Sequence, residues 1–385
     1  MKPRAGSKAL IREINEALIL DIVRTQSPVS RATLAAQTGL SAASVTGITG
    51  KLIQAKLLVE TEIIRDTGGR PARLLELGRD GVFAAGVRLS PTEALAVVVD
   101  LRGGVVATHR EPLTSTEPAD AADAVAAAVR SAVGDRASRL IGVGVTLSGV
   151  VDQARGMVRH SGALGWADVH FQVILEDALE EPIIIDSYVN AYARGLLFDG
   201  SFTGRELLVF SVGMSLGAAV VVEGRIQRGF SGSAGGFAHS RAITGAEAVR
   251  HCHCGAEDCL ETRGSLWGMR YELQQRSGQD RDINPDVDGE LIADAAWHLG
   301  VGMANVAKVL GPEKVIVGFA PEAQLGKFAE QNMESFQRQY DHANTPPPAF
   351  DTAIANHAEL ARGAACSVLG GLFVARDSQP AAQSA

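Results

Sequence analysis

Three of the four cysteines of the chain lie within eight positions, in the segment HCHCGAEDCLE. Cys252, Cys254 and Cys259 form a Cys-x-Cys-x4-Cys pattern, which places three thiol groups on one compact loop. Such thiolates are typical zinc ligands, but a tetrahedral zinc ion needs a fourth ligand. His251 and His253 lie beside the thiols, yet their adjacency makes simultaneous ligation geometrically awkward. The spacing therefore predicts a zinc site and leaves its fourth ligand open.

The cellular compartment decides between zinc and other uses of these thiols. The segment MKPRAGSKALIREINEALILDIV lacks the unbroken apolar core and cleavage site of a signal peptide. No apolar run reaches the roughly 18 residues of a membrane span. A cytoplasmic protein without a membrane partner is expected, and its thiols would stay reduced. Free thiols remain the alternative to zinc, whereas Cys366, in the apolar segment ARGAACSVLG, is expected to pack in the core.

The charges are divided unevenly along the 385 residues, a length sufficient for two or three domains. Residues 1–80 carry 12 Lys and Arg against 8 Asp and Glu, whereas the rest of the chain carries 24 against 36. A small basic head on an acidic body indicates that the head alone meets a polyanion.

The basic head has the pattern of a helix-turn-helix. Residues 7–25 predict a helix, because apolar residues recur every four positions. Two more helices follow, capped by Ser30 and Ser41, and the turn between them has Gly39 where a positive φ is needed. This arrangement would place residues 41–51 in a DNA major groove.

Two strand-like segments, LLVETEII and ARLLEL, and the basic loop RDTGGRPA between them predict a wing. The wing tip could enter the minor groove. The groove-facing helix has no arginine or asparagine for bidentate base contacts, so specificity would depend on short hydroxyl side chains and the wing. The alternative is a three-helix module that binds protein. The predicted DNA-binding residues are Arg31, Ser41, Ala42, Ser44, Thr46, Lys51, Arg65, Arg70 and Arg73, with Arg31 and Lys51 on phosphates.

After the head, short apolar strands alternate with helices. VFAAGVRLS, EALAVVVDL and GVVATHREPL predict a meander, followed by a helix at about 118–138 and the buried strand LIGVGVTLSG. A helix around 168–180, the strand PIIID and a helix from about 189 come next. The pattern recurs with strands ELLVFSV and GAAVVVEGRIQRG, a helix at 291–310, the strand KVIVGF and a helix at 322–340. Two such units predict a two-lobed α/β body with a cleft.

Three motifs behind the winged helix, GVGVTLSGVVDQARGMVRHSGALGW, GFSGSAGGFAHS and CHCGAEDCLE, together resemble the repressor–open-reading-frame–kinase (ROK) family. The resemblance covers essentially the whole chain and implies an actin-like, ribonuclease-H-like body of the ATPase type. The implied divisions are a winged helix-turn-helix at 1–80, an effector and oligomerisation domain at 81–376 (lobe I about 81–190 plus the helix 357–376, lobe II about 191–356) and a disordered tail at 377–385.

In the family an upstream histidine completes the zinc site, and this position maps to His239. The resemblance therefore implies a structural zinc ion held by His239, Cys252, Cys254 and Cys259. With three thiolates and one imidazole the coordination shell is closed, so the ion would stabilise the fold rather than act on a substrate.

The family contains sugar kinases and sugar-responsive regulators, and the winged head places this chain with the regulators. Kinase members carry Asp-x-Gly-Gly-Thr on the first strand of the body, where this chain has RLSPT with Arg88 at the aspartate position. Their second phosphate loop, Gly-Thr-Gly-x-Gly, reads GMSLG here, and Tyr188 occupies the position of the catalytic aspartate. An ordinary tyrosine, with a pKa near 10, is a poor general base at neutral pH. No catalytic residue and no kinase activity are expected.

The same comparison implies a modified sugar site. Two family positions that contact sugar hydroxyls are Ala163 and Gly236 here, so a neutral hexose should bind poorly. Arg88 and Tyr188, expected at the cleft mouth, would favour a sugar phosphate, a sugar acid or a flat ligand; the alternative is an exposed salt-bridging arginine and a cleft-filling tyrosine. The predicted effector-binding residues are Arg88, Ala163, Ser187, Tyr188, His239 and Glu261.

These features predict a transcription regulator, expected to repress carbohydrate-metabolism genes. It would bind a palindromic operator in double-stranded DNA as a homodimer or homotetramer. A sugar, sugar phosphate or sugar acid would change the angle between the lobes and thereby the spacing of two heads. Two alternatives stay open: a regulator gated by a partner protein without a small effector, and a sugar kinase with an accessory head.

Overall fold

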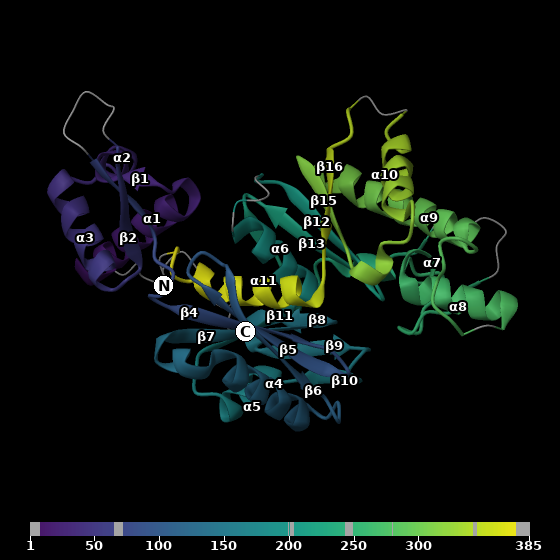
Figure 1. Cartoon of the computed structure of the whole chain (residues 1–385). Helices are drawn as coiled ribbons and strands as arrows, with labels where there is room; N and C mark the ends of the chain where they lie inside the picture. Colours follow the sequence, from purple (N-terminus) through teal and green to yellow (C-terminus); the bar gives the residue numbers. More distant parts are fainter. Residues whose placement is uncertain are drawn as a thin grey trace.

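The computed structural model describes residues 8–64, 72–198, 200, 204–242, 249–278, 280–341 and 345–374. Within these ranges a small N-terminal head adjoins a body built on two large sheets (Figure 1). None of the helices in the described ranges combines the length and apolar character that a membrane span requires. The tail expected at 377–385 lies outside the described residues.

The head confirms the predicted helices, caps and turn. Ser30 Oγ accepts a hydrogen bond from the Thr33 N–H and Ser41 Oγ accepts one from the Ser44 N–H, each at 3.1 Å. Gly39 between the two helices has a φ of +70°, which a residue with a Cβ rarely adopts. The elements are α1 (Lys8–Gln26), β1 (Val29–Ser30), α2 (Arg31–Thr38), α3 (Ala42–Gln54), β2 (Leu58–Ile64) and β3 (Ala72–Leu77), with sheet order β1-β3-β2.

The head packs directly on the body. One continuous cluster of buried apolar side chains includes Ile19 of α1 together with Phe198 and Phe373 of the body. The Arg102 guanidinium of the body also donates a hydrogen bond to the Leu77 carbonyl of β3, at 2.8 Å. A shared apolar core resists relative motion more than a polar linker does.

The two large sheets repeat one topology, which confirms the two predicted units. In each, the first three strands form an antiparallel meander, and the fourth and fifth strands add in parallel beyond the first. The lobe I sheet has the order β11-β7-β4-β5-β6 and the lobe II sheet the order β14-β13-β12-β15-β16. The strands are β4 (Phe83–Leu89), β5 (Glu93–Asp100), β6 (Val105–Pro112), β7 (Leu140–Leu147), β11 (Ile183–Ser187), β12 (Leu207–Val212), β13 (Leu216–Val222), β14 (Arg225–Gln227), β15 (Lys314–Phe319) and β16 (Ala349–Ile354).

Helices form layers on these sheets. α4 and α5 share a buried core with the lobe I sheet, α8 to α10 share one with the lobe II sheet, and α6 and α11 lie between the sheets (Figure 1). A small sheet of β10-β9-β8 adjoins lobe I. The remaining elements are α4 (Pro118–Val133), β8 (Val150–Asp152), β9 (Met157–Ser161), β10 (Trp166–Val169), α5 (Phe171–Ala178), α6 (Tyr188–Phe198), α7 (Glu261–Gly264), α8 (Leu266–Ser277), α9 (Gly289–Leu310), α10 (Phe328–Arg338) and α11 (His357–Gly370), with 3-10 turns η1 (Gly134–Arg139), η2 (Gln153–Arg155), η3 (Phe230–Gly232), η4 (Gly236–His239) and η5 (Pro321–Ala323).

The structure corrects two predicted boundaries. GAAVVVEGRIQRG is not one strand, because Glu223 and Gly224 both adopt a positive φ and turn the chain between β13 and β14. The helix expected at 322–340 begins only at Phe328, after the turn η5. The sequence analysis also did not identify β8 to β10, α8 or β16. Most of these strands are short and lack the alternating pattern that marks a half-buried strand.

The central helix α11 contacts its neighbours backbone to backbone. A Cβ at Gly86 of β4 would lie 1.9 Å from the Ala361 carbonyl oxygen of α11, and a Cβ at Gly363 would lie 1.9 Å from the Ala191 carbonyl oxygen of α6. No side chain fits at these distances, so glycine is required for α11 to lie between the sheet and α6.

We predict that Gly363→Ala lowers the free energy of unfolding by about 2–4 kcal/mol, because the added methyl group must push α6 and α11 apart. Gly370→Ala, in the same helix but with no atom within 4 Å of the added Cβ, is the matched control and should leave stability unchanged or slightly raised. Urea unfolding measures both. Equal effects of the two substitutions would contradict the proposed contact.

Candidate zinc centre and effector site

Four side chains converge on one point of lobe II. The ligand atoms of His239, Cys252, Cys254 and Cys259, here called the histidine–cysteine cluster, all lie within 4.8 Å of one another. Cys254 Sγ lies 3.6 Å from Cys259 Sγ, and Cys252 Sγ lies 3.7 Å from His239 Nδ1. The structure therefore brings together the four residues named from the sequence.

Local backbone pairing sets this geometry. The Leu260 N–H donates to the Ser240 carbonyl and the Ala242 N–H donates to the Asp258 carbonyl, each at 2.8 Å. These bonds join the segment after η4 to the end of the cysteine loop, so His239 is held beside the thiols although it lies 13 residues before Cys252.

The donor set fits a tetrahedral metal ion. Sulfur atoms bound to zinc at ~2.3 Å lie about 3.7 Å apart, which matches the observed separations and is far longer than a disulfide bond. Partial burial lowers the pKa of His239, which favours the neutral imidazole that a metal ion requires. Burial raises the pKa of Cys259 to about 12, so a bound cation is needed to keep this thiol deprotonated.

We predict that the purified protein contains about one zinc ion per chain. Cys254→Ser should lose this ion and lower the melting temperature by several degrees. Cys254 is exposed, so serine itself should disturb little. His251→Ala is the control, because this exposed histidine lies outside the cluster and its removal should leave the zinc content unchanged. Metal analysis and thermal unfolding with and without a chelator measure the effect; an unchanged melting temperature after verified zinc loss would contradict it.

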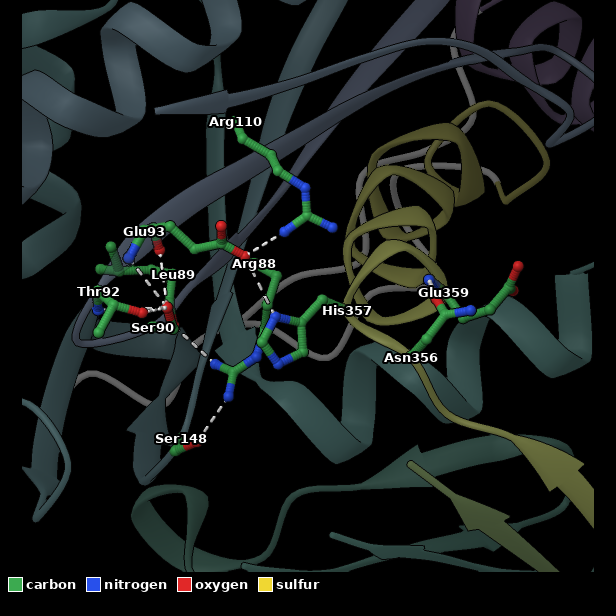
Figure 2. Close-up of polar contacts among 10 residues, drawn as sticks. All are labelled: Arg88, Leu89, Ser90, Thr92, Glu93, Arg110, Ser148, Asn356, His357 and Glu359. Carbon is green, nitrogen blue, oxygen red and sulfur yellow. Dashed lines mark hydrogen bonds and ion pairs between the residues drawn. The ribbon is translucent and has the colours of Figure 1, made fainter. Parts of the chain in front are cut away.

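Arg88 is buried rather than exposed at a cleft mouth, which corrects the sequence expectation. Its residue is 8% exposed, and its guanidinium donates to the Leu89 carbonyl at 2.7 Å and to Ser148 Oγ at 2.8 Å (Figure 2). Burial lowers its pKa to about 10, so it stays positively charged at neutral pH. Among the described residues, its Nε has no hydrogen-bond partner. The strand that carries Arg88 thus presents a fixed cation.

Near Arg88, polar side-chain contacts connect β5 to α11. Figure 2 shows the Glu93 carboxylate between two side chains: Arg110 donates to it at 2.5 Å, and His357 Nδ1 lies 3.4 Å from it. His357 is the first residue of α11, where the chain returns from lobe II to lobe I, and Asn356 caps the helix by accepting from the Glu359 N–H at 2.9 Å. These contacts fix the crossover at the start of α11.

Tyr188 packs against Gly217 of the segment GMSLG. It is buried at the start of α6, its hydroxyl would lie 2.6 Å from a Cβ at Gly217, and the Arg88 guanidinium lies 5.2 Å from its ring centroid. Burial raises its pKa to about 12. A phenol with this pKa does not accept a proton at neutral pH, so it offers no general base.

The other predicted effector residues are unequally placed. Glu261 is 1% exposed, accepts from the Leu216 N–H at 2.8 Å and has its pKa raised to about 8 by burial, so its carboxyl group is mostly protonated at neutral pH. Ser187 ends β11 beside Tyr188. Ala163 is exposed, and its neighbour Gly162 approaches His253 of the cysteine loop.

An ion pair that the sequence analysis missed joins the two lobes. Arg228, after β14, donates to Asp186 Oδ2 through Nε at 3.0 Å and Nη2 at 2.6 Å. Asp186, next to the end of β11, has a 4% exposed side chain, and also accepts from Asn190 at 2.9 Å and Gln153 at 3.3 Å. A charged residue at the end of the apolar strand PIIID is the only sequence signal for this cluster.

A separate pocket of about 360 Å³ lies next to the cysteine loop. Ser240, Leu260 and one side of α9 line it, and none of the predicted effector-binding residues does. The pocket is therefore not the site that the sequence predicted.

Only some of the predicted DNA-contacting residues are exposed on the surface of the head. Ala42, Ser44, Thr46 and Lys51 are exposed along α3. Arg31 is partly buried and already bound, because it donates to Thr49 Oγ1 at 3.0 Å and to Glu60 Oε1 at 2.7 Å. Ser41 caps α3, and Arg73, with a 64% exposed side chain, pairs with the other oxygen of Glu60. Arg65 and Arg70 lie outside the described residues, and DNA contact by all of these residues stays a prediction.

Together these features define a class of protein: a helix-turn-helix head on a two-lobed, actin-like body that carries the histidine–cysteine cluster. The ROK family model matches residues 84–369, and the chain belongs to the ROK family. The expected family and fold are thus confirmed.

One curated relative and two solved structures are similar to this chain. It is 26% identical over 369 residues to the xylose repressor of Caldicellulosiruptor bescii, covering 87% of this chain and 91% of the relative. The crystal structure of a ROK transcriptional regulator, a homologue of the Escherichia coli MLC protein, matches with a TM-score of 0.75 at 21% identity, over 94% of this chain and 97% of that one. A ROK glucokinase from Streptomyces griseus, in complex with glucose and AMPPNP, matches with a TM-score of 0.62 at 21% identity, over 75% of this chain and all of the kinase.

Proposed function

We propose that this protein is a cytoplasmic transcription regulator that binds operator DNA through its head and senses a sugar-derived effector through its body. The similarity to a xylose repressor over 87% of this chain carries this proposal. A repressor of carbohydrate-metabolism genes, bound as a dimer or tetramer to a palindromic operator, is the form it would take.

The geometry of the head supports DNA binding. α3 follows a capped turn, and its exposed face carries small and hydroxyl side chains that permit a close approach to base edges. Arg73 and Lys51 would bind phosphates at either side of that face. Arg31 would instead hold α2, α3 and β2 together through Thr49 and Glu60.

The geometry of the body supports the absence of kinase activity. A buried arginine stands where the kinases of the family carry an acidic residue, so it would repel the Mg²⁺ ion that phosphoryl transfer requires. Tyr188 occupies the space above the second phosphate loop and has no base function at neutral pH. The histidine–cysteine cluster would hold a structural zinc ion that fixes η4 to the cysteine loop.

The same residues support an effector with an acidic or planar group. Arg88 keeps a positive charge inside the body and has one donor, Nε, left over for a ligand oxygen. Glu261, buried beside the cysteine loop, would form a hydrogen bond with a sugar hydroxyl. A regulator that responds only to a partner protein remains the second candidate, favoured by the filling of the family's phosphate site by Arg88 and Tyr188.

We predict salt-sensitive binding to a duplex from the protein's own promoter, weakened in Arg73→Ala with a loss of about one unit in the slope of log affinity against log salt. Arg338→Ala removes a similarly exposed arginine from α10 of the body and should change neither quantity. Fluorescence anisotropy across a salt series measures both. Equal binding to promoter and unrelated DNA would contradict the proposed function.

We predict that no sugar in a panel of neutral sugars, sugar phosphates and sugar acids stimulates ADP release from ATP. In thermal-shift measurements with the same panel, anionic members should raise the melting temperature more than glucose does, and Arg88→Met should remove the difference because it removes the buried charge. Arg338→Ala, which removes an exposed arginine of α10, is the control. Turnover of ATP, or a response to glucose alone, would contradict these expectations.

A further inference from the structure

One helix joins the proposed effector site to the DNA-binding head. α6 begins at Tyr188, directly after Ser187, and ends at Phe198. Tyr188 contacts Arg88 at one end of the helix, and Phe198 contacts α1 of the head at the other. The helix spans 11 residues, or about 16 Å. This single element is long enough to connect the two sites.

The contact between α6 and the head centres on Arg24, in the last turn of α1. Its Nη1 donates to the Phe198 carbonyl at 2.5 Å, and its guanidinium lies 5.4 Å from the Phe198 ring and 5.3 Å from the Phe373 ring. Asp21 accepts from the same guanidinium at 2.6 Å and orients it. α1 in turn packs on α2 and α3, so its position fixes that of the predicted groove-facing helix.

The start of α6 is bound to lobe II. Tyr192 packs in a buried cluster with Val209 and Val221 of the lobe II sheet, and its hydroxyl donates to the Ile354 carbonyl of β16 at 3.0 Å. The strand before α6 belongs to the lobe I sheet, and its junction with α6 carries Asp186, the partner of Arg228. A rotation of lobe II relative to lobe I would therefore act on α6 through these contacts.

We propose that α6 transmits the state of the interlobe contact to the head, with Arg24 as the positioning residue that couples them. This proposal rests on the proposed function and specifies its regulation. The Asp186–Arg228 ion pair holds the lobes in the conformation seen here, and a change at this pair shifts α6 along its axis. Arg24 carries that shift into α1 because it binds the carbonyl at the end of α6 and both neighbouring rings. The head is thereby reoriented without any flexible linker.

The test is a double-mutant cycle that needs no knowledge of the effector. Arg228→Ala, or the nearly isosteric Asp186→Asn, breaks the ion pair between the lobes. The measured quantity is the dissociation constant for the promoter duplex. With Arg24 present, either substitution should alter the dissociation constant at least fivefold, the range of ordinary allosteric coupling. In an Arg24→Ala background the change should fall below twofold. Arg24→Lys should not restore it, because lysine lacks the planar group that stacks on the rings and reaches the carbonyl together.

Arg12→Ala is the matched control. Arg12 is an exposed arginine of α1, and more than half the length of this helix separates it from Arg24. In this background the response to Arg228→Ala should be intact. Circular dichroism and melting temperature select variants that are folded, and Asp186→Asn replaces Arg228→Ala if the latter is not. An equal response with and without Arg24, or no response to either lobe substitution, overturns the proposal.

Hydrogen exchange separates this proposal from the proposed function. Arg228→Ala should raise amide exchange in residues 21–26 of α1 in the absence of DNA, and Arg24→Ala should abolish that change. If the protein binds no promoter DNA but this pattern appears, the transmission stands and the proposed function fails. If the protein binds DNA but exchange in α1 does not respond, the transmission is wrong while the proposed function stands.

Discussion

The close backbone contact of α11 with β4 and α6 is the constraint on which the rest of the molecule depends. Gly86 and Gly363 bring the helix within the distance that only a missing Cβ allows. The two sheets can then share one thin helical layer, with α6 and α11 as its members (Figure 1). Because α6 starts at the lobe junction and α11 ends beside the head, this layer links three parts of the chain that are far apart in sequence. A helix layer of ordinary thickness would separate them.

Arg88 and Tyr188 lie against each other inside the body. Both side chains are buried: Arg88 contributes a charge, and Tyr188 contributes a ring whose hydroxyl lies against Gly217. Burial keeps the tyrosine neutral, and the arginine stays cationic at neutral pH, and both states oppose phosphoryl transfer. The two side chains are thus part of the buried packing of the body, which agrees with the proposed absence of kinase activity.

Two polar clusters stabilise different parts of the body: one acts within lobe II and the other acts between the lobes. The histidine–cysteine cluster fixes η4 to the cysteine loop within the lobe, over a distance suited to metal coordination. The Asp186–Arg228 pair instead acts between lobes, and removing one partner of a buried pair strands the other charge at a cost of about 3–5 kcal/mol. The first cluster joins two segments of one lobe, whereas the second joins residues of two lobes and so depends on the angle between them.

Much of the protein follows from the sequence alone. Serine caps, the Gly39 turn and apolar periodicity specify the head, and the repeated order of apolar strands specifies two sheets, because these signals act between neighbouring residues. The cysteine spacing indicates three of the four candidate metal ligands, since three thiols on one loop already approximate a coordination shell, whereas His239 is implied only by the family resemblance. The tertiary structure alone decided that Arg88 is buried, that Asp186 meets Arg228 and that Arg24 binds the end of α6. The two contacts join residues at least 42 positions apart. The burial of Arg88 depends on how the two sheets stack around α11. No local sequence pattern encodes the distance between separate layers of a fold.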